Sequence, residues 1–356
     1  MKRRGYLLIL AVVLLSVFVG QLALAAVKLP EITHEMLTVA PDQPVGEKGV
    51  FADDKLVIGF SQRRLAGSEW YENLINVAKK EAEHLGVELI VFDAQGDIAK
   101  QISDIETLIA KQVDALIVNP QDSEGVLPAI KKVHETNIPL VVVNSALSPE
   151  GAPFTFVSTD AFGTGFKSGQ ELAKAVVEKW GNKKEVKAAI ISGYPKELES
   201  DRRRWGQIAG YTDYMLEKYG RNNLNIVSLK FGHWLPDVTM PIVQDIVMRN
   251  PDLDIIFAAC DGTTQGVVSG LQSTGKLGDI LIGSIDGRKS VIKWMMEDDK
   301  GIAVSVMNDP RLMGKWAVFF AAYKAMGAVT PSQFFVPNPA ITPENAAEYY
   351  NPDSSY

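Results

Sequence analysis

The 356-residue chain contains one cysteine and only four histidines, and this scarcity excludes several kinds of site. Cys260 alone cannot form an internal disulfide or a cysteine-rich zinc site. The histidines, at positions 34, 84, 134 and 233, lie far apart and lack HExxH-like spacing, so we expect no metal and no cofactor. The sequence also lacks a G-x-S-x-G elbow, a Walker-type loop and a histidine beside a plausible nucleophile. These absences argue against an enzyme.

Positive charge is also in deficit. The chain has 36 Lys and Arg against 43 Asp and Glu, a formal net charge of -7. Nucleic-acid binding generally requires a basic face, so we expect no nucleic-acid partner. The composition, 46% apolar and 22% charged, is ordinary for a globular protein. The length suffices for two lobes of about 150 residues each.

The N-terminus has the pattern of an export signal. Lys2, Arg3 and Arg4 precede an almost wholly apolar run over 6–20, and "ALA" at 23–25 supplies small residues for cleavage. We therefore predict a signal peptide over 1–25 and a periplasmic protein. An uncleaved membrane anchor is the alternative, because the apolar run approaches the length that spans a bilayer. Residues 26–54 mix charges with Pro and Gly and are expected to form a tether or N-terminal extension.

From Lys55 onward, short apolar runs alternate with longer segments of helical character. Runs that are apolar on both faces predict buried strands of parallel sheets with helices on both sides. Ten strands are too many for one comfortable open sheet, so we predict two doubly wound α/β lobes. The ten runs are 55–60, 87–92, 114–120, 138–144, 154–160, 187–193, 224–231, 253–261, 279–287 and 301–309.

Polar residues follow many of these runs. The strand "IPLVVV", for example, leads directly into Asn144 and Ser145. Ligands of open parallel sheets bind outside the carboxyl ends of the strands, which favours a binding cleft here. Loops and helix caps also favour such residues and account for part of the pattern. They do not account for Trp70 and Tyr71 after the first strand, or for Trp234 after the seventh.

Longer stretches resemble a known family. "KLVIGFSQRRLAGSEWYENLINVAKKEAEHLG" is similar to the first strand and helix of periplasmic sugar-binding proteins of the ribose-binding type. "ALIVNPQDSEGVLPAIKKVHETNIPLVVVN" resembles that family's third and fourth strands, and "PDLDIIFAACDGTTQGVVSGLQSTGK" with "IGSIDG" resembles its C-terminal lobe. The likeness covers roughly residues 55–345. LacI-type repressors share the fold but carry a DNA-reading helix-turn-helix where this chain has its export signal.

The resemblance implies a type 1 periplasmic binding protein fold, two lobes that close on a ligand about a three-strand hinge. It places the crossovers near 159–160, 308–309 and 336–337. The N-terminal lobe would comprise 55–159 plus 309–336, and the C-terminal lobe 160–308 plus 337–356. Because the ligand touches both lobes only when they are shut, closure would be a population shift.

The resemblance also implies binding residues. Aromatic rings would cover the apolar faces of a sugar, and polar groups would bond its hydroxyls. Asn144-Ser145 replaces the family's Asp-Arg pair, Gln207 its arginine and Cys260 its asparagine. Arg204 is the favoured substitute for the missing guanidinium; Arg202 and Arg203 are alternatives, and all three could instead be a solvated helix start. The expected site is Ser68, Trp70, Tyr71, Asn144, Ser145, Arg204, Gln207, Trp234, Cys260, Asp286 and Asn308.

These residues favour a neutral monosaccharide or polyol as ligand. A small methylated ammonium compound is the alternative, because aromatic faces attract cations. Sugar acids and phosphates are disfavoured unless Arg204 points inward. We expect a monomeric receptor that delivers its ligand to the permease of an ABC importer. A sensor subunit for a histidine kinase or chemoreceptor would have the same pocket and stays open as an alternative.

Overall fold

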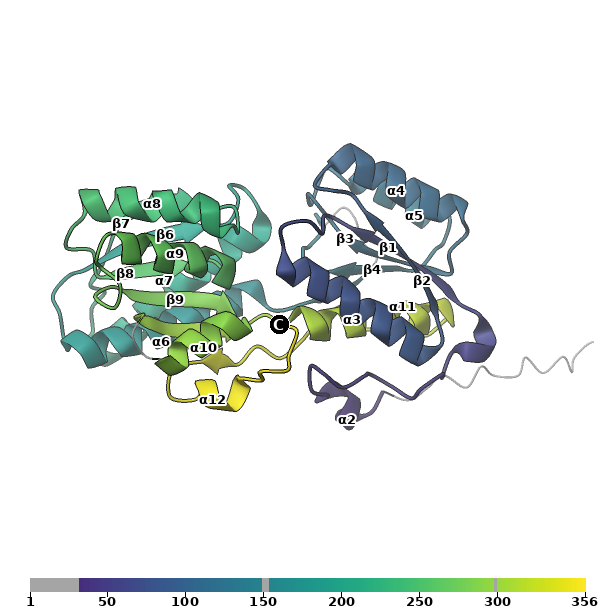
Figure 1. Cartoon of the computed structure of the whole chain (residues 1–356). Coiled ribbons are helices and arrows are strands. Elements are labelled where there is room, and N and C mark those ends of the chain that lie inside the picture. The colour runs from purple at the N-terminus through teal and green to yellow at the C-terminus, as the bar shows by residue number, and fades with distance from the viewer. Residues whose placement is uncertain (1–31, 149–153, 298–299) are drawn as a thin grey trace, which may run out of the picture.

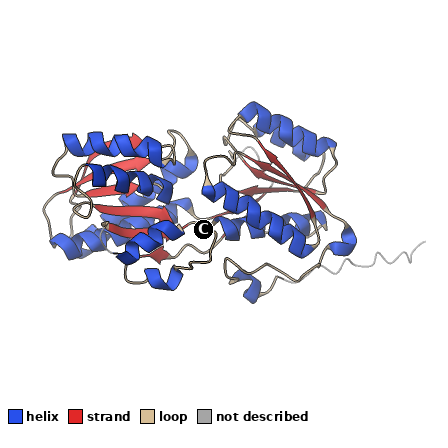
Figure 2. Cartoon of the chain, viewed as in Figure 1, coloured by secondary structure: helices blue, strands red, loops and turns tan. Residues whose placement is uncertain are grey.

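The computed structural model of the chain describes residues 32–148, 154–297 and 300–356. It contains two separate parallel sheets, each with helices on both faces, as Figures 1 and 2 show. All ten predicted strands are present, and the predicted fold class is confirmed. The predicted signal peptide over 1–25 lies outside the described residues. Within them, no helix has the length and apolarity to cross a membrane.

The first sheet is parallel throughout and has the strand order β11-β5-β4-β3-β1-β2. Neighbouring residues of a strand face opposite helix layers: Ile117 packs with α3 and α11, whereas Leu116 and Val118 pack with α4 and α5. This explains the continuous apolar runs. The elements are β1 (Val57–Gln62), α3 (Glu69–Leu85), β2 (Glu88–Asp93), α4 (Ile98–Ala110), β3 (Ala115–Asn119), α5 (Leu127–Glu135), β4 (Leu140–Val143), β5 (Thr155–Ser158), α11 (Pro310–Ala325) and β11 (Gln333–Phe335).

The second sheet repeats this order as β12-β10-β9-β8-β6-β7, except that β12 runs antiparallel to β10. Helices α6 and α7 cover one face, and α8, α9 and α10 the other. The short strands β11 and β12 were not predicted. The elements are α6 (Ala161–Trp180), β6 (Val186–Ser192), α7 (Leu198–Tyr219), β7 (Leu224–Phe231), α8 (Pro236–Arg249), β8 (Ile255–Ala258), α9 (Asp261–Ser273), β9 (Leu281–Asp286), α10 (Lys289–Glu297), β10 (Ile302–Met307), β12 (Ala340–Ile341) and α12 (Ala346–Tyr349).

The chain passes between the two sheets three times: after β5, between β10 and α11, and between β11 and β12. Side chains tie two of these crossings together, because the Thr159 hydroxyl donates to Oδ1 of Asn308 at 2.8 Å. Each sheet and the helices on its faces form one body of the molecule. The C-terminal end of the chain lies beside the crossings, between the two bodies (Figure 1). Tyr356 is buried there, with the guanidinium of Arg288 5.9 Å from its ring centre. The chain crossings between the two bodies therefore lie together, beside the C-terminal residues.

The N-terminal segment over 32–54 packs on the first body, and over its described part it is not a free tether. It contains α2 (His34–Leu37) and the 3-10 turn η1 (Ala52–Asp54). Val45 and Phe51 are buried with α3 and α11. The backbone N–H of Val45 donates to the Glu81 carboxylate at 2.8 Å, and Lys315 donates to the carbonyls of Ala40 and Gln43. Two buried charged side chains thus fix this segment in place.

Candidate binding cleft

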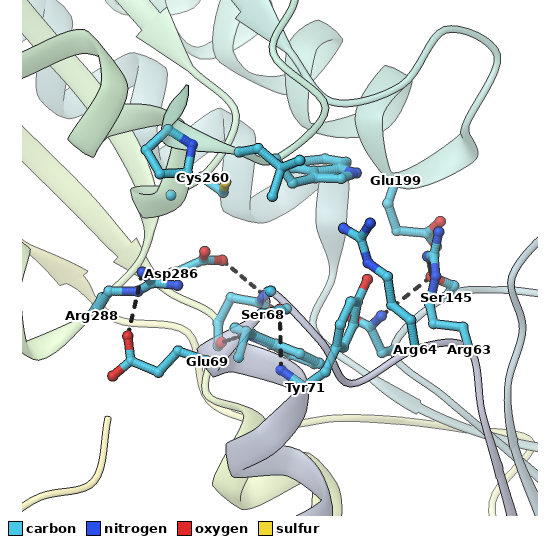
Figure 3. Close-up of a pocket in the computed structure, with 18 of the residues that line it drawn as sticks. Arg63, Arg64, Ser68, Glu69, Tyr71, Ser145, Glu199, Cys260, Asp286 and Arg288 are labelled. Carbon is cyan, nitrogen blue, oxygen red and sulfur yellow. Dashed lines mark hydrogen bonds and ion pairs between the residues drawn. The ribbon is translucent and has the colours of Figure 1, made fainter. Parts of the chain in front are cut away.

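A cavity of about 250 Å³ lies between the two bodies, at the carboxyl ends of their strands (Figure 3). Its walls come from both sides, as expected for open parallel sheets. The first body contributes Arg63, Arg64, Gly67, Ser68, Glu69, Trp70, Tyr71, Asn144 and Ser145; the second contributes Glu197, Glu199, Arg203, Trp234, Leu235, Pro236, Cys260, Gly262, Gln265, Asp286 and Arg288; Asn308 lies at a crossing.

The start of α3 presents the aromatic side chains of the first wall. Ser68 caps the helix by accepting a hydrogen bond from the backbone N–H of Tyr71 at 3.3 Å. The rings of Trp70 and Tyr71 meet edge to face, with centroids 5.5 Å apart. The indole N–H of Trp70 donates to the backbone carbonyl of Asn308 at 2.9 Å. Trp70 therefore connects the first wall to the crossing as well as lining the cavity.

The end of β4 supplies the polar part of the first wall. Asn144 adopts a left-handed backbone with φ of 66°, which turns the chain out of the sheet. Its amide donates to Oδ1 of Asn119 at 3.3 Å and to the Ser145 hydroxyl at 3.2 Å. Arg63 donates to the same hydroxyl at 3.1 Å. This network holds the Asn144 and Ser145 side chains at the cavity.

Asp286 is the buried carboxylate of the second wall. It ends β9 with φ of 131°, a conformation rarely adopted by residues other than glycine. Its Oδ1 accepts from the Asn308 amide at 3.1 Å and lies 3.4 Å from a guanidinium nitrogen of Arg203. Burial raises the Asp286 pKa, and the Arg203 charge opposes that rise. Asn308 and Arg203 thus both hold the carboxylate of this strained residue.

Asp261 supports this wall from behind and does not line the cavity. It is fully buried and accepts from the hydroxyls of Ser284 and Ser305 and from the backbone N–H of Arg288, at 2.5, 2.8 and 2.6 Å. These bonds align the ends of β9 and β10. Burial, followed by the charge of Asp286, raises the Asp261 pKa.

A glycine makes room for Trp234. A Cβ added at Gly193 would lie 2.0 Å from the indole ring, so only glycine allows the ring to rest on this backbone. The indole N–H donates to Glu197 at 2.9 Å, and the Arg203 guanidinium lies 5.5 Å from the ring centre. Hydrogen bonding and packing together fix the ring at the cavity.

Cys260 lies at the cavity as the N-cap of α9. Its sulfur accepts from the backbone N–H of Thr263 at 3.3 Å. Burial raises the pKa of the thiol to about 11, so it stays protonated and unreactive at neutral pH.

Two of the eleven predicted site residues, Arg204 and Gln207, do not line the cavity. Arg204 pairs instead with Asp201 at 2.7 Å, one turn earlier on α7. Arg203 is the arginine that reaches the cavity, because successive helical residues point about 100° apart. Gln207 is buried one turn further along and donates to the carbonyls of Ala258 and Gly283 at 3.1 and 3.3 Å. It fastens α7 to the sheet.

Sequence reasoning missed the charged residues that approach each other across the cavity. Arg63 pairs with Glu197 at 3.2 Å, and Arg288 pairs with Glu69 at 3.4 Å. The Glu199 carboxylate accepts from the backbone N–H of Ala146 at 3.0 Å. Each contact joins the first body to the second. The pair "RR" directly after the first strand was the available signal, since that position lies at the carboxyl end of the sheet.

The chain matches the family described as periplasmic binding protein domain over residues 58–328. It belongs to this family. The ribose import binding protein RbsB of Bacillus subtilis is 28% identical over 263 residues, covering 74% of this chain and 79% of that protein. The family consists of binding proteins, so the predicted family and the prediction of a binding protein rather than an enzyme are confirmed.

Solved structures of the family have the same fold. An ABC transporter solute binding protein from Mycobacterium smegmatis, with bound glycerol, superposes with a TM-score of 0.74 and 26% identity, covering 83% of this chain and 96% of that one. A periplasmic solute binding protein from Actinobacillus succinogenes with bound D-allose gives the same TM-score at 24% identity, covering 83% and 100%.

The cavity is equipped to hold a small polar molecule. It offers aromatic faces from Trp70, Tyr71 and Trp234, and hydrogen-bonding groups around their edges. No cluster of three or more His, Cys, Asp or Glu side chains suited to a metal occurs in the part of the chain that the structure describes. The arrangement suits binding by burial and hydrogen bonding.

Proposed function

We propose that the protein is the extracytoplasmic receptor of an ABC importer, which binds a monosaccharide or polyol between two lobes and delivers it to a membrane permease. The observation that carries the proposal is the cavity between the two bodies, with aromatic rings and hydrogen-bonding groups in both walls. The relatives add support, since one is named a ribose import protein and another holds glycerol.

The two bodies would act as lobes, 55–159 plus 309–336 and 160–308 plus 337–356, hinged at the three crossings. Ligand would favour the closed form because it contacts both walls at once. The cross-cavity pairs Arg63–Glu197 and Arg288–Glu69 would add to closure at opposite sides of the cavity. Both pairs are at least partly buried, and the cost of desolvating their charges offsets much of their attraction, so the ligand supplies the main driving force.

The proposed ligand contacts are the nine predicted residues at the cavity. Tyr71 and the two indoles would cover apolar faces of the ligand, and Asp286 would accept from its hydroxyls in strong charge-assisted bonds. The nine are Ser68, Trp70, Tyr71, Asn144, Ser145, Trp234, Cys260, Asp286 and Asn308.

A methylated ammonium ligand fits the cavity less well. The aromatic rings would attract a cation, but the Arg203 guanidinium already lies over Trp234, and those of Arg63 and Arg64 each lie 5.8 Å from the Tyr71 ring centre. Two of the three aromatic rings at the cavity therefore already face cations of the protein. The second candidate function is that of a sensor subunit, which would report the bound ligand to a histidine kinase or chemoreceptor. In either case the mature protein would be a periplasmic monomer, exported by a cleaved signal peptide over 1–25.

A thermal-shift panel of pentoses, hexoses, polyols, their acids and small betaines tests the binding proposal. We expect at least one polyhydroxylated compound to stabilise the mature protein by about 2.7 kcal/mol at a hundredfold excess over its dissociation constant. A response to betaines alone, or to no compound, would refute a sugar receptor. Deleting the gene then separates the two destinations: lost uptake of the ligand supports the importer, and retained uptake with a lost transcriptional or chemotactic response supports the sensor.

A further inference from the structure

The cavity wall carries four arginines, and three of them are paired. Arg63 pairs with Glu197 at 3.2 Å, Arg203 with Asp286 at 3.4 Å and Arg288 with Glu69 at 3.4 Å. An ion pair inside a partly dry cavity leaves little net charge for a ligand to meet. These three guanidiniums therefore do not demand an anionic ligand.

Arg64 differs from the other three. Among the described residues, no carboxylate lies within ion-pair distance of its guanidinium, which lies 5.8 Å from the centre of the Tyr71 ring. Its Nε is buried and has no hydrogen-bond acceptor. A guanidinium nitrogen removed from water without an acceptor is unfavourable. In the occupied cavity, an acceptor group of the ligand would satisfy this nitrogen.

The fourth carboxylate at the cavity does not compensate Arg64. Glu199 is buried and directs its carboxylate to the backbone N–H of Ala146 at 3.0 Å. Burial raises its pKa, and the neighbouring charge of Glu197 adds to the rise. Glu199 therefore does not pair with the Arg64 guanidinium.

The two sides of the cavity differ in the chemical groups of a ligand that they can bind. Figure 3 shows Arg64 on the same side as Tyr71 and Ser145, with Asp286 and Arg288 on the opposite side. The side of Asp286 combines an acceptor with donors, since the Nε atoms of Arg203 and Arg288 also lack acceptors. Hydroxyl groups, which both donate and accept, match that mixture. An acceptor with negative charge matches the side of Arg64.

We propose that the ligand is a polyhydroxylated carboxylate of monosaccharide size, with its carboxylate on Arg64 and its hydroxyls toward Asp286 and Arg288. This inference rests on the proposed function, and it replaces the neutral ligand expected from the sequence with an acidic one. Guanidinium and carboxylate are geometrically matched for paired hydrogen bonds, which are stronger than those to a neutral hydroxyl. The cavity volume of about 250 Å³ suits a single sugar unit better than an oligosaccharide.

Matched pairs of acids and neutral compounds test this proposal by calorimetry on the mature protein. Suitable pairs are gluconate with glucitol, galactonate with galactitol, glucuronate with glucose, galacturonate with galactose, and the pentonates with the pentitols. We expect at least one acid to bind ten or more times tighter than its neutral partner. R64Q should weaken that acid at least tenfold and change a neutral compound by less than threefold.

Control variants separate a ligand contact from a structural effect. R204Q removes the same charge outside the cavity, where Arg204 pairs with Asp201, and should leave both affinities unchanged. R64K keeps the charge and should recover part of the affinity for the acid. Equal losses for acid and neutral compounds in R64Q would overturn the role of Arg64.

The outcomes also distinguish this inference from the function on which it rests. If neutral sugars or polyols bind as tightly as their acids, or tighter, the acidic ligand is refuted and the sugar receptor stands. Tighter binding of sugar phosphates than of carboxylates would likewise refute the carboxylate. If no compound of any pair binds, the proposed function fails as well.

Discussion

The two bodies share a strand order but differ in how they use their buried charged side chains. In the first, Glu81 and Lys315 are buried beneath the N-terminal segment over 32–54, and Arg63 is buried at the cavity. In the second, Arg203, Asp261 and Asp286 are buried at or directly behind the cavity. Burying a charge is costly and requires specific partners. The first body thus uses two of these buried charges to fix a segment of chain, whereas the second uses three to shape a binding wall.

The largest expected effect comes from removing a buried partner in the second body. Asp286→Ala leaves the Arg203 guanidinium buried without its carboxylate, and we expect the free energy of unfolding to fall by about 3–5 kcal/mol. Chemical denaturation measures this directly. Asp201→Ala is the matched control, because it breaks the half-exposed pair with Arg204 on the same helix and should cost less than about 1 kcal/mol. Similar losses in the two variants would erase the contrast between buried and surface charge.

An intermediate effect is expected in the first body, as a dependence on pH. Burial raises the pKa of Glu81 from 4.5 to about 7, so the folded state retains a proton that the unfolded chain releases. Stability should therefore fall by roughly 1–3 kcal/mol as the pH rises from about 4.5 through 7. The side chain of Glu81→Gln cannot ionise, so the melting temperature of this variant should depend much less on pH over that range.

A companion variant tests whether Glu81, rather than a neighbouring histidine, causes this pH dependence of stability. Nε2 of His84 donates to the Gly46 carbonyl at 3.1 Å, and this side chain also lies under the segment. His84→Gln should keep the slope of stability between pH 4.5 and 6 if Glu81 causes it. A slope that disappears in His84→Gln and persists in Glu81→Gln would assign the effect to the histidine.

The smallest expected effect tests how far the first wall is coupled to the crossings. Trp70→Phe keeps an aromatic face but loses the indole bond to the carbonyl of Asn308. A single such bond is worth about 0.5–1.5 kcal/mol, so ligand affinity should weaken by roughly two- to twelvefold. Calorimetry with any ligand found in the panel measures the change. Trp70→Ala, which removes the ring as well, should be clearly worse; equal losses would mean that the ring contributes nothing.

The sequence predicted those parts of the molecule whose burial depends on a local pattern. The ten apolar runs became β1 to β10 because strands buried on both faces need such runs. Strands β11 and β12 have only three and two residues, too short for a pattern to emerge. The packing of Val45 and Phe51 was also unpredictable, because isolated apolar residues in a segment without periodicity show no face.

The candidate site divides in the same way. Residues at strand ends and at the start of α3 could be placed, because the ends of parallel strands converge at one edge. Arg203 could not be told from Arg204, since a helix's phase depends on its contact with the sheet. Glu197 lies in the loop before α7, and only the approach of the two bodies brings it to Arg63. Contacts between distant loops leave no signal in either segment alone.

The solitary thiol of this chain has a practical consequence for measuring ligand capture. Cys260 is shielded and its proton is firmly held, so maleimide reagents should react with it slowly. A cysteine introduced on the outer surface could therefore carry one fluorescent dye with the native residue left in place. The receptor is in this respect already suited to conversion into an optical sensor.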